Sequence, residues 1–137
     1  MAYMNQDRKK LINENLKKVC QPLGIKYSLA VRSHMTICMT IRSAPIDFIG
    51  NYNEATRNPG HIGYGRNQLA EKSIQVNPYH YQNAFTGKAL EAITKIMAAL
   101  KSAGWYDNSD AQTDYFDTAY YTDLDIGSWD KPFQVTE

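Results

Sequence analysis

The chain has 137 residues, of which 43% are hydrophobic and 21% charged, and its formal net charge is +1. This composition is ordinary for a globular protein, and the length favours a single domain over residues 1–137 that needs neither a metal nor a disulfide to fold. No apolar run reaches the roughly 18 residues that a membrane span needs, and the N-terminus lacks the apolar core of a signal peptide. We therefore expect a single-domain cytoplasmic protein that does not enter a membrane.

Residues 5–20 predict an amphipathic helix. Asn5 is its expected cap, because a short side-chain oxygen can accept from the free N–H groups of a first helical turn. Gly24 follows as part of the stop signal. The predicted core stripe consists of Leu11, Ile12, Leu16 and Val19. The other faces are basic and carry Arg8, Lys9, Lys10, Lys17 and Lys18.

Residues 26–32 and 36–42 alternate between apolar and polar side chains, which predicts a β-hairpin. A two-residue turn would pair apolar with polar positions. A three-residue connection over residues 33–35 instead places Val31 opposite Ile37 and keeps the apolar side chains on one face. We therefore expect the three-residue connection, with His34 exposed at its tip.

The middle of the chain predicts shorter elements. Pro45 suits the first turn of a helix, and residues 46–56 are compatible with a short one. Residues 57–71 contain one proline and three glycines, which is typical of an irregular segment. A short strand over residues 73–77 follows.

The second half predicts one long helix and the closing strands. Residues 87–103 have an apolar stripe, with Thr86 as the candidate cap, and Gly104 ends the helix. Residues 114–122 and 123–128 predict one long or two short strands. This order of elements indicates an α+β fold: an antiparallel sheet of about four to five strands with two main helices and one short helix packed on it.

Charge and aromatic residues are distributed unevenly. Residues 1–104 carry a net charge of +8, whereas residues 105–137 carry −7, with eight acidic residues and one lysine. Eight aromatic side chains lie in the same acidic segment. Rings supply contact area, and carboxylates favour a basic partner, so this segment is the first candidate for a recognition surface.

No complete catalytic or metal signature is present. Cys20 and Cys38 are expected to be reduced and buried. Asp114, Asp117, Asp123 and Asp125 lack the glutamate and the other oxygen ligands of a calcium loop, and we interpret them as residues of turns and strand ends. We expect no cofactor and no metal.

One glycine-rich segment keeps an enzymatic alternative open. Gly60 to Arg66 could cradle an anion with its backbone N–H groups, although its spacing is not that of a phosphate-binding loop. His80 follows a short strand among tyrosines and is the histidine best placed to act with it. The alternative is a small enzyme or nucleotide-binding module that uses this loop and His80, but on balance the sequence favours a protein that is not an enzyme.

Three parts of the sequence carry a family resemblance. They are YSLAVR with MTIRSAP in the hairpin, Val76-Asn77 with Tyr79-His80, and TDYFD, Tyr120-Tyr121 and IGSWDKPF near the C-terminus. Over roughly residues 5–135 the chain resembles a family of small α+β domains carried by phages and conjugative plasmids, which occur alone and inside large polyvalent proteins. The resemblance implies a mobile-element protein that acts against host defence, and it brings no catalytic residues.

The leading hypothesis is a non-enzymatic binding protein that inhibits a host defence complex of the CRISPR or restriction type. Its acidic and aromatic surface would occupy a cationic nucleic-acid channel. The candidate partner-binding residues are Tyr115, Phe116, Asp117, Tyr120, Tyr121, Asp123 and Trp129. At least half of the rings are expected to be core residues instead.

A third possibility is a nucleic-acid-binding accessory protein of a mobile element. It would use basic residues against phosphates, with tyrosines for stacking on bases. The candidate residues are Arg8, Lys9, Lys17, Arg32 and Arg42. The acidic C-terminal third argues against general DNA binding.

Overall fold

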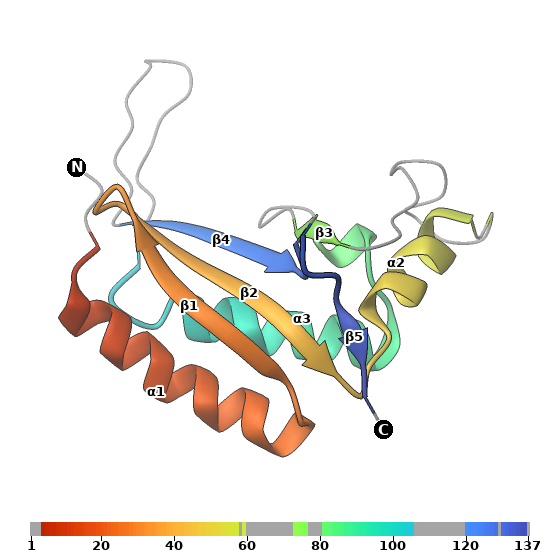
Figure 1. Cartoon of the computed structure of the whole chain (residues 1–137), viewed down its shortest axis with the longest axis horizontal. Helices are drawn as coiled ribbons and strands as arrows, with labels where there is room; N and C mark the ends of the chain where they lie inside the picture. The colour runs from red at the N-terminus through yellow and green to blue at the C-terminus, as the bar shows by residue number, and fades with distance from the viewer. Residues whose placement is uncertain are drawn as a thin grey trace, which may run out of the picture.

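A computed structural model of the chain describes residues 4–57, 59, 73–76, 81–105, 120–128 and 130–136. Within these ranges the helices are α1 (Gln6–Leu23), α2 (Phe48–Arg57) and α3 (Gly87–Leu100), with a short 3-10 turn, η1 (Tyr81–Asn83). The strands are β1 (Lys26–Arg32), β2 (Thr36–Ala44), β3 (Ile74–Val76), β4 (Tyr121–Ile126) and β5 (Gln134–Val135). Figure 1 shows how they are arranged.

The sheet has the order β1-β2-β4-β3, and β5 pairs with the end of β2. The α+β class is confirmed, but the expectation of an antiparallel sheet is wrong. Strands β1 and β3 are antiparallel to their neighbours, whereas β4 and β5 both run parallel to β2. The reason is the connection: the chain leaves β2 and returns to it only after α2, β3 and α3, so that β4 enters the sheet in the same direction as β2.

The hairpin register follows the prediction. Val31 pairs with Ile37 and Leu29 with Met39, across a three-residue connection. Ser33 and His34 both adopt a φ of 56°, which turns the chain tightly. His34 is exposed at the tip, as expected, and its carbonyl accepts a hydrogen bond from the Met4 amide at 2.7 Å. This bond ties the start of the described chain to the hairpin.

The cap and the stop residue of α1 follow the prediction, although the helix runs to Leu23 rather than to residue 20. Asn5 Oδ1 accepts from the Arg8 amide at 2.8 Å, and Gly24 ends the helix with a left-handed φ of 69°. The predicted stripe is wrong at one position, because Leu11 is 44% exposed. The fully buried residues of α1 are instead Ile12, Leu16 and Cys20, which lie four residues apart along one face.

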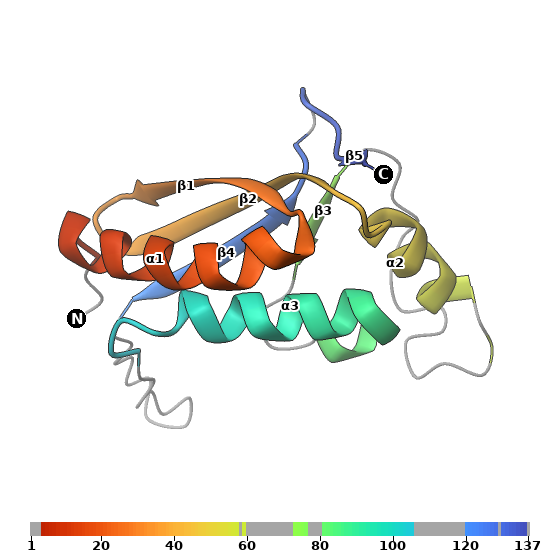
Figure 2. The same cartoon turned by 90° about the horizontal axis from the view of Figure 1, so that it is seen from below.

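Helices α1 and α3 cover one face of the sheet, as seen in Figure 2. The core lies between the helices and the sheet, and α3 buries Ile93, Ile96, Met97 and Leu100 in it. The Thr86 side chain makes no cap bond to its own helix. Instead Thr86 is joined to Asn51 of α2 by hydrogen bonds, the shortest of them from the Thr86 amide to Asn51 Oδ1 at 2.8 Å. These bonds fix α2 against the start of α3.

The opposite face of the sheet is covered by none of the described helices, and Figure 1 looks onto it. Among the described residues, no helix has the length and apolar character to cross a membrane.

Candidate functional site: the open face of the sheet

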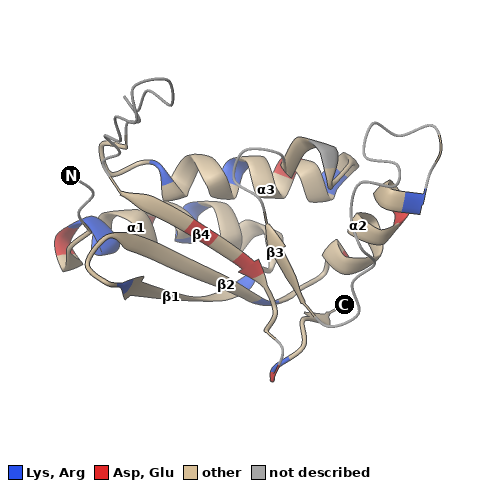
Figure 3. Ribbon diagram, turned by 90° about the horizontal axis from the view of Figure 1, so that it is seen from above, with Lys and Arg blue, Asp and Glu red and all other residues tan. Residues whose placement is uncertain are grey.

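The open face consists of the β-strand side chains that point away from α1 and α3. Side chains alternate along a strand, so the burial of Leu124 and Ile126 under the helices turns Asp123 and Asp125 outward. The strand register then places Cys38 beside Asp123, and Thr40 beside Asp125. The members of the open face are Ser28, Ala30, Arg32, Thr36, Cys38, Thr40, Arg42, Gln75, Tyr121, Asp123 and Asp125. Figure 3 shows the acidic positions along β4.

Asp123 has a cationic partner on this face. The Arg32 guanidinium donates to Asp123 Oδ2 at 2.9 Å and reaches across β2 to do so. The Arg32 side chain is 64% exposed and that of Asp123 only 14%. The pair therefore leaves the arginine accessible, while the Asp123 carboxylate is largely screened by its neighbours.

Among the described residues Asp125 has no such partner. Within the described part of the chain it forms neither a hydrogen bond nor an ion pair. Burial raises the pKa of its carboxyl from 3.8 to about 6, and the nearby charge of Asp123 adds to the rise, while Arg32 opposes it. A carboxylate at this position is thus half-buried and close to a second carboxylate, and among the described residues only the more distant charge of Arg32 stabilises its ionised form.

Neither cysteine is activated as a nucleophile. Burial raises the pKa of Cys38, Arg32 acts in the opposite direction, and Asp123 and Asp125 raise it further. Burial alone raises the pKa of the Cys20 thiol to about 11. Because the thiolate is the reactive form, both groups are poor nucleophiles at neutral pH. Both are free thiols, with Cys20 buried as predicted and Cys38 half-buried at the open face.

The structure separates the two neighbouring tyrosines of the predicted site. Tyr121 is 44% exposed on the open face, beside Asp123. Tyr120 is fully buried: its hydroxyl donates to the Leu100 carbonyl at 2.6 Å, and the Ala103 amide donates to that hydroxyl at 3.3 Å. Tyr120 is therefore a core residue that closes the C-terminal end of α3, and the prediction that it contacts a partner is wrong.

Four other predicted partner-binding residues lie outside the described residues. They are Tyr115, Phe116, Asp117 and Trp129. The segment from Gly60 to Arg66 and His80, which support the enzymatic alternative, also lie outside them. Of the predicted set, the structure thus brings together Tyr121 and Asp123.

Sequence reasoning omitted Asp125 and Arg32 from the partner-binding set. The signal was present, since residues 123 and 125 are two apart on a strand and must share a face. Arg32 was assigned only to nucleic-acid binding, because Asp123 lies 91 residues away in sequence and comes close only when β1 and β4 pair with opposite sides of β2.

The basic residues proposed for nucleic-acid binding do not share one surface. Arg32 and Arg42 both belong to the open face, and the Arg42 guanidinium donates to Ser128 Oγ at 3.5 Å. Lys9 and Lys17 belong to α1 and line a groove beside β1. The Arg8 guanidinium lies 5.8 Å from the ring centroid of Tyr120. The structure therefore distributes this set over different parts of the molecule.

Comparisons with protein-family models, with curated proteins and with solved structures found no match to this chain.

Proposed function

We propose that this chain is a non-enzymatic binding protein that engages a basic surface of a partner protein through its open face. The residues that carry this role are Tyr121, Asp123 and Asp125. In the setting implied by the sequence resemblance, the partner is a nucleic-acid-binding complex of host defence. This protein would then inhibit the complex by occupying its cationic surface.

The observation that carries the proposal is the uncompensated Asp125. Its charged form is disfavoured by burial and by Asp123, so the residue reduces stability at neutral pH. A threonine or valine at this strand position would avoid that penalty. Residues that reduce the stability of a fold are characteristic of sites kept for function.

The chemistry of the face favours a cationic partner. An arginine or lysine brought next to Asp125 would supply the missing counter-charge and would restore its pKa toward the ordinary range. The half-exposed Tyr121 ring lies on the same face and offers an amphipathic contact surface beside the carboxylates. Binding would therefore relieve an unfavourable interaction that is already present in the free protein.

The raised thiol pKa values support a binding role over covalent catalysis. Cys38 is the one nucleophilic side chain among the described residues of the open face that could form a thioester or a disulfide with a partner. The two aspartates and burial hold it in the protonated form.

The test uses affinity capture from a bacterial lysate that contains CRISPR and restriction complexes, read by mass spectrometry. The bait variants are Asp123→Asn, Asp125→Asn and the double variant. Glu54→Gln, which removes an exposed carboxylate of α2, is the matched control. Asp125→Asn is the sharpest variant because the charge it removes is destabilising, so that lost binding cannot be explained by unfolding.

The expected result is one stoichiometric partner that is lost with the double variant, weakened with Asp125→Asn and retained with the control. Its binding should also weaken in high salt, because it depends on charge. A partner retained by the double variant would overturn the assignment to the open face. A lysate that yields no partner would contradict inhibition by binding, and a thermal-shift screen with nucleotides would then test the glycine-rich segment.

A further inference from the structure

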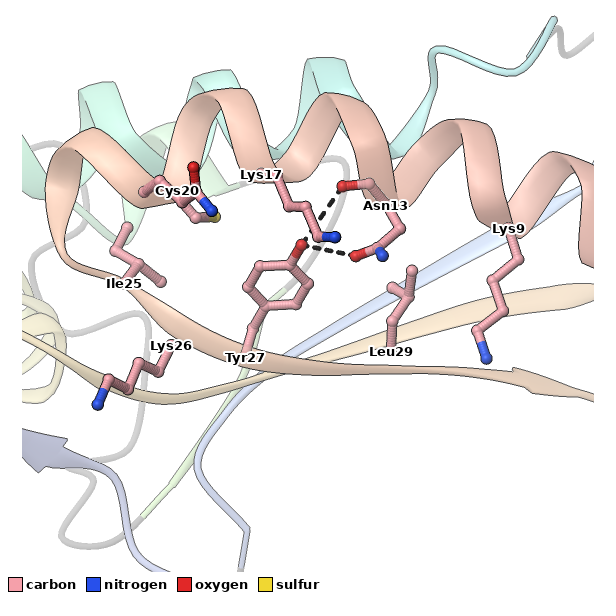
Figure 4. Close-up of a pocket in the computed structure, with 9 residues that line it drawn as sticks. Lys9, Asn13, Lys17, Cys20, Ile25, Lys26, Tyr27 and Leu29 are labelled. Atoms are coloured by element: carbon pink, nitrogen blue, oxygen red, sulfur yellow. Dashed lines mark hydrogen bonds between the residues drawn. The ribbon is translucent and has the colours of Figure 1, made fainter.

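A groove lies between α1 and the outer edge of β1, away from the open-face carboxylates. It has a volume of about 590 Å³, and the described residues that line it are Lys9, Asn13, Lys17, Cys20, Gln21, Ile25, Lys26, Tyr27 and Leu29. Three of them are lysines and none is acidic. In Figure 4, Lys9 and Lys17 extend from α1 toward β1 on either side of Leu29, with Lys17 next to the Tyr27 ring. The groove is therefore cationic, with an apolar floor.

The strand beside this groove has a free edge. In the sheet order, β1 is terminal and pairs only with β2 among the described strands. The other terminal strand, β3, has three residues, whereas β1 has seven and pairs without interruption from Tyr27 to Arg32. Regular exposed edges are usually blocked by prolines, bulges or short length, because their unpaired N–H and C=O groups can add another strand. β1 contains no proline and is not short, and its one irregularity, a register shift between Lys26 and Tyr27, lies at its first residue.

The floor of the groove is held in place by one side-chain contact. The Tyr27 hydroxyl donates to Asn13 Oδ1 at 2.7 Å and joins β1 to α1. Tyr27 and Leu29 are both half-buried against the core, so each leaves part of its apolar surface in the groove. If a peptide strand paired with β1, the side chains on one of its faces would cover the exposed apolar surface of Tyr27 and Leu29.

The spacing of the lysines matches an extended peptide. Lys9 and Lys17 are eight residues apart, which corresponds to about 12 Å along a helix. Residues i and i+4 of a strand lie on one face and are separated by about 13 Å. A strand added to β1 can therefore present two carboxylates to Lys9 and Lys17, and an apolar side chain at i+2 to Tyr27 and Leu29.

We propose that β1 is a docking edge for an extended acidic peptide with the pattern acidic–x–apolar–x–acidic. The backbone of the peptide pairs with β1, as in other cases of strand addition, and its carboxylates pair with Lys9 and Lys17. Charge complementarity selects this occupant over a neutral or basic segment. The surface is separate from the open face, so the protein can hold a basic partner surface and an acidic peptide at the same time.

The experiment measures binding of a fluorescein-labelled peptide, TETVTET, by fluorescence anisotropy. Its control is TEVTETT, which has the same composition but places the two glutamates on opposite faces of a strand. The protein variants are Lys9→Glu with Lys17→Glu, and, as matched control, Lys10→Glu with Lys18→Glu, two exposed lysines of α1 that do not line the groove. Two further peptides have the sequence TETVTET with N-methylated backbone amides. One is methylated at the odd-numbered residues and the other at the even-numbered residues.

We expect TETVTET to bind more tightly than TEVTETT, and the Lys9→Glu, Lys17→Glu variant to weaken it by roughly tenfold while the control variant does not. One of the two N-methylated peptides should lose binding, because only one set of amides faces β1. Equal binding of both peptides, or no effect of the groove variant, would overturn the proposal.

Two other outcomes would also overturn it. If a poly(dT) strand binds through Lys9 and Lys17 and the peptide does not, the groove recognises phosphates. If sedimentation shows a dimer that the Lys9→Glu, Lys17→Glu variant dissociates, and no peptide binds, the edge pairs with a second copy of the chain. Circular dichroism of each variant confirms that the fold is retained.

Discussion

Replacing Asp125 with asparagine is expected to stabilise the protein at neutral pH. Burial and the charge of Asp123 raise the pKa of Asp125 from 3.8 to about 6 in the folded protein. One pKa unit corresponds to about 1.4 kcal/mol, so the full shift corresponds to about 3 kcal/mol. Asp125 is only half-buried, and solvent screening reduces this value; we expect a gain of about 1 to 2 kcal/mol.

The gain should depend on pH in a defined direction. The folded pKa of Asp125 lies above the unfolded value, so the unfolded chain releases this proton first as the pH rises. The stability contributed by Asp125 therefore falls between about pH 4 and about pH 6 and stays constant above that window. The free energy of unfolding of the asparagine variant does not fall in this window, because asparagine does not ionise. The difference in stability between the variant and the wild type should be largest at about pH 7.5 and should approach zero near pH 4.

Urea denaturation of both proteins at the two pH values measures this difference. The control is Glu14→Gln, which removes an exposed carboxylate from α1 and should give no comparable gain. The reasoning is refuted if Asp125→Asn is no more stable than the wild type at neutral pH. It is also refuted if the gain is the same at both pH values, since it would then not come from ionisation.

Other substitutions test individual contacts. Tyr120→Phe should lower the free energy of unfolding by about 1 to 3 kcal/mol, because two backbone groups at the end of α3 lose their buried partner. Asn51→Ala should lower it by a similar amount, about 1 to 3 kcal/mol, through its lost bonds to Thr86. Arg32→Gln should raise the pKa of Asp125 further, which an NMR titration of the carboxyl carbon would detect.

Each of these substitutions has a matched control. Tyr121→Phe alters the neighbouring ring, which is 44% exposed, and should leave the unfolding curve in place. Glu54→Ala on the same helix controls for Asn51. Lys95→Gln, an exposed cation of α3, should not move the pKa of Asp125. Equal effects in a substitution and its control would mean that the contact named here does not carry the energy assigned to it.

The local features of the fold were predictable because neighbouring residues determine them. The hairpin register follows from the alternation of seven-residue segments, since a slip of one residue would have turned Val31 and Leu29 away from the core. The Asn5 cap follows from the chemistry of its side chain. In α1 the predicted core stripe included Leu11, which is exposed, and did not include Cys20, although Cys20 was expected to be buried. Apolar residues on two neighbouring stripes of the helix made the choice between them ambiguous.

The parallel pairing of β4 with β2 could not be predicted in this way. Alternation reports which side chains share a face, but it does not report the direction of the neighbouring strand. The direction depends on where α2 and α3 pack, and that is decided by contacts between distant residues. Apolar alternation alone therefore supported the α+β class and could not distinguish an antiparallel from a mixed sheet.

The difference between Tyr120 and Tyr121 was within reach of the sequence. Leu124 and Ile126 are the apolar residues of β4, and residues an even number of positions away share their face. Continuing that alternation backwards assigns Tyr120 to the core and Tyr121 to the open face. The same continuation assigns Asp123 and Asp125 to the open face together. What alternation cannot supply is the missing cation at Asp125, which depends on the neighbouring strands.

The central position of β2 has a consequence for how the chain is made. On one side Thr36 pairs with Arg32 of the hairpin, which is only four residues away in sequence. On the other side it pairs with Tyr121, which is 85 residues away. Closing the longer loop is less favourable by about 3 kcal/mol, at about 0.6 kcal/mol for each doubling of length. A nascent chain translated through residue 57 already contains the hairpin and none of β4. Until β4 is synthesised, the edge of β2 beside Ile37, Met39 and Ile41 is unpaired and can pair with other chains. Aggregation should therefore be most pronounced when many nascent chains are present together, as in fast expression.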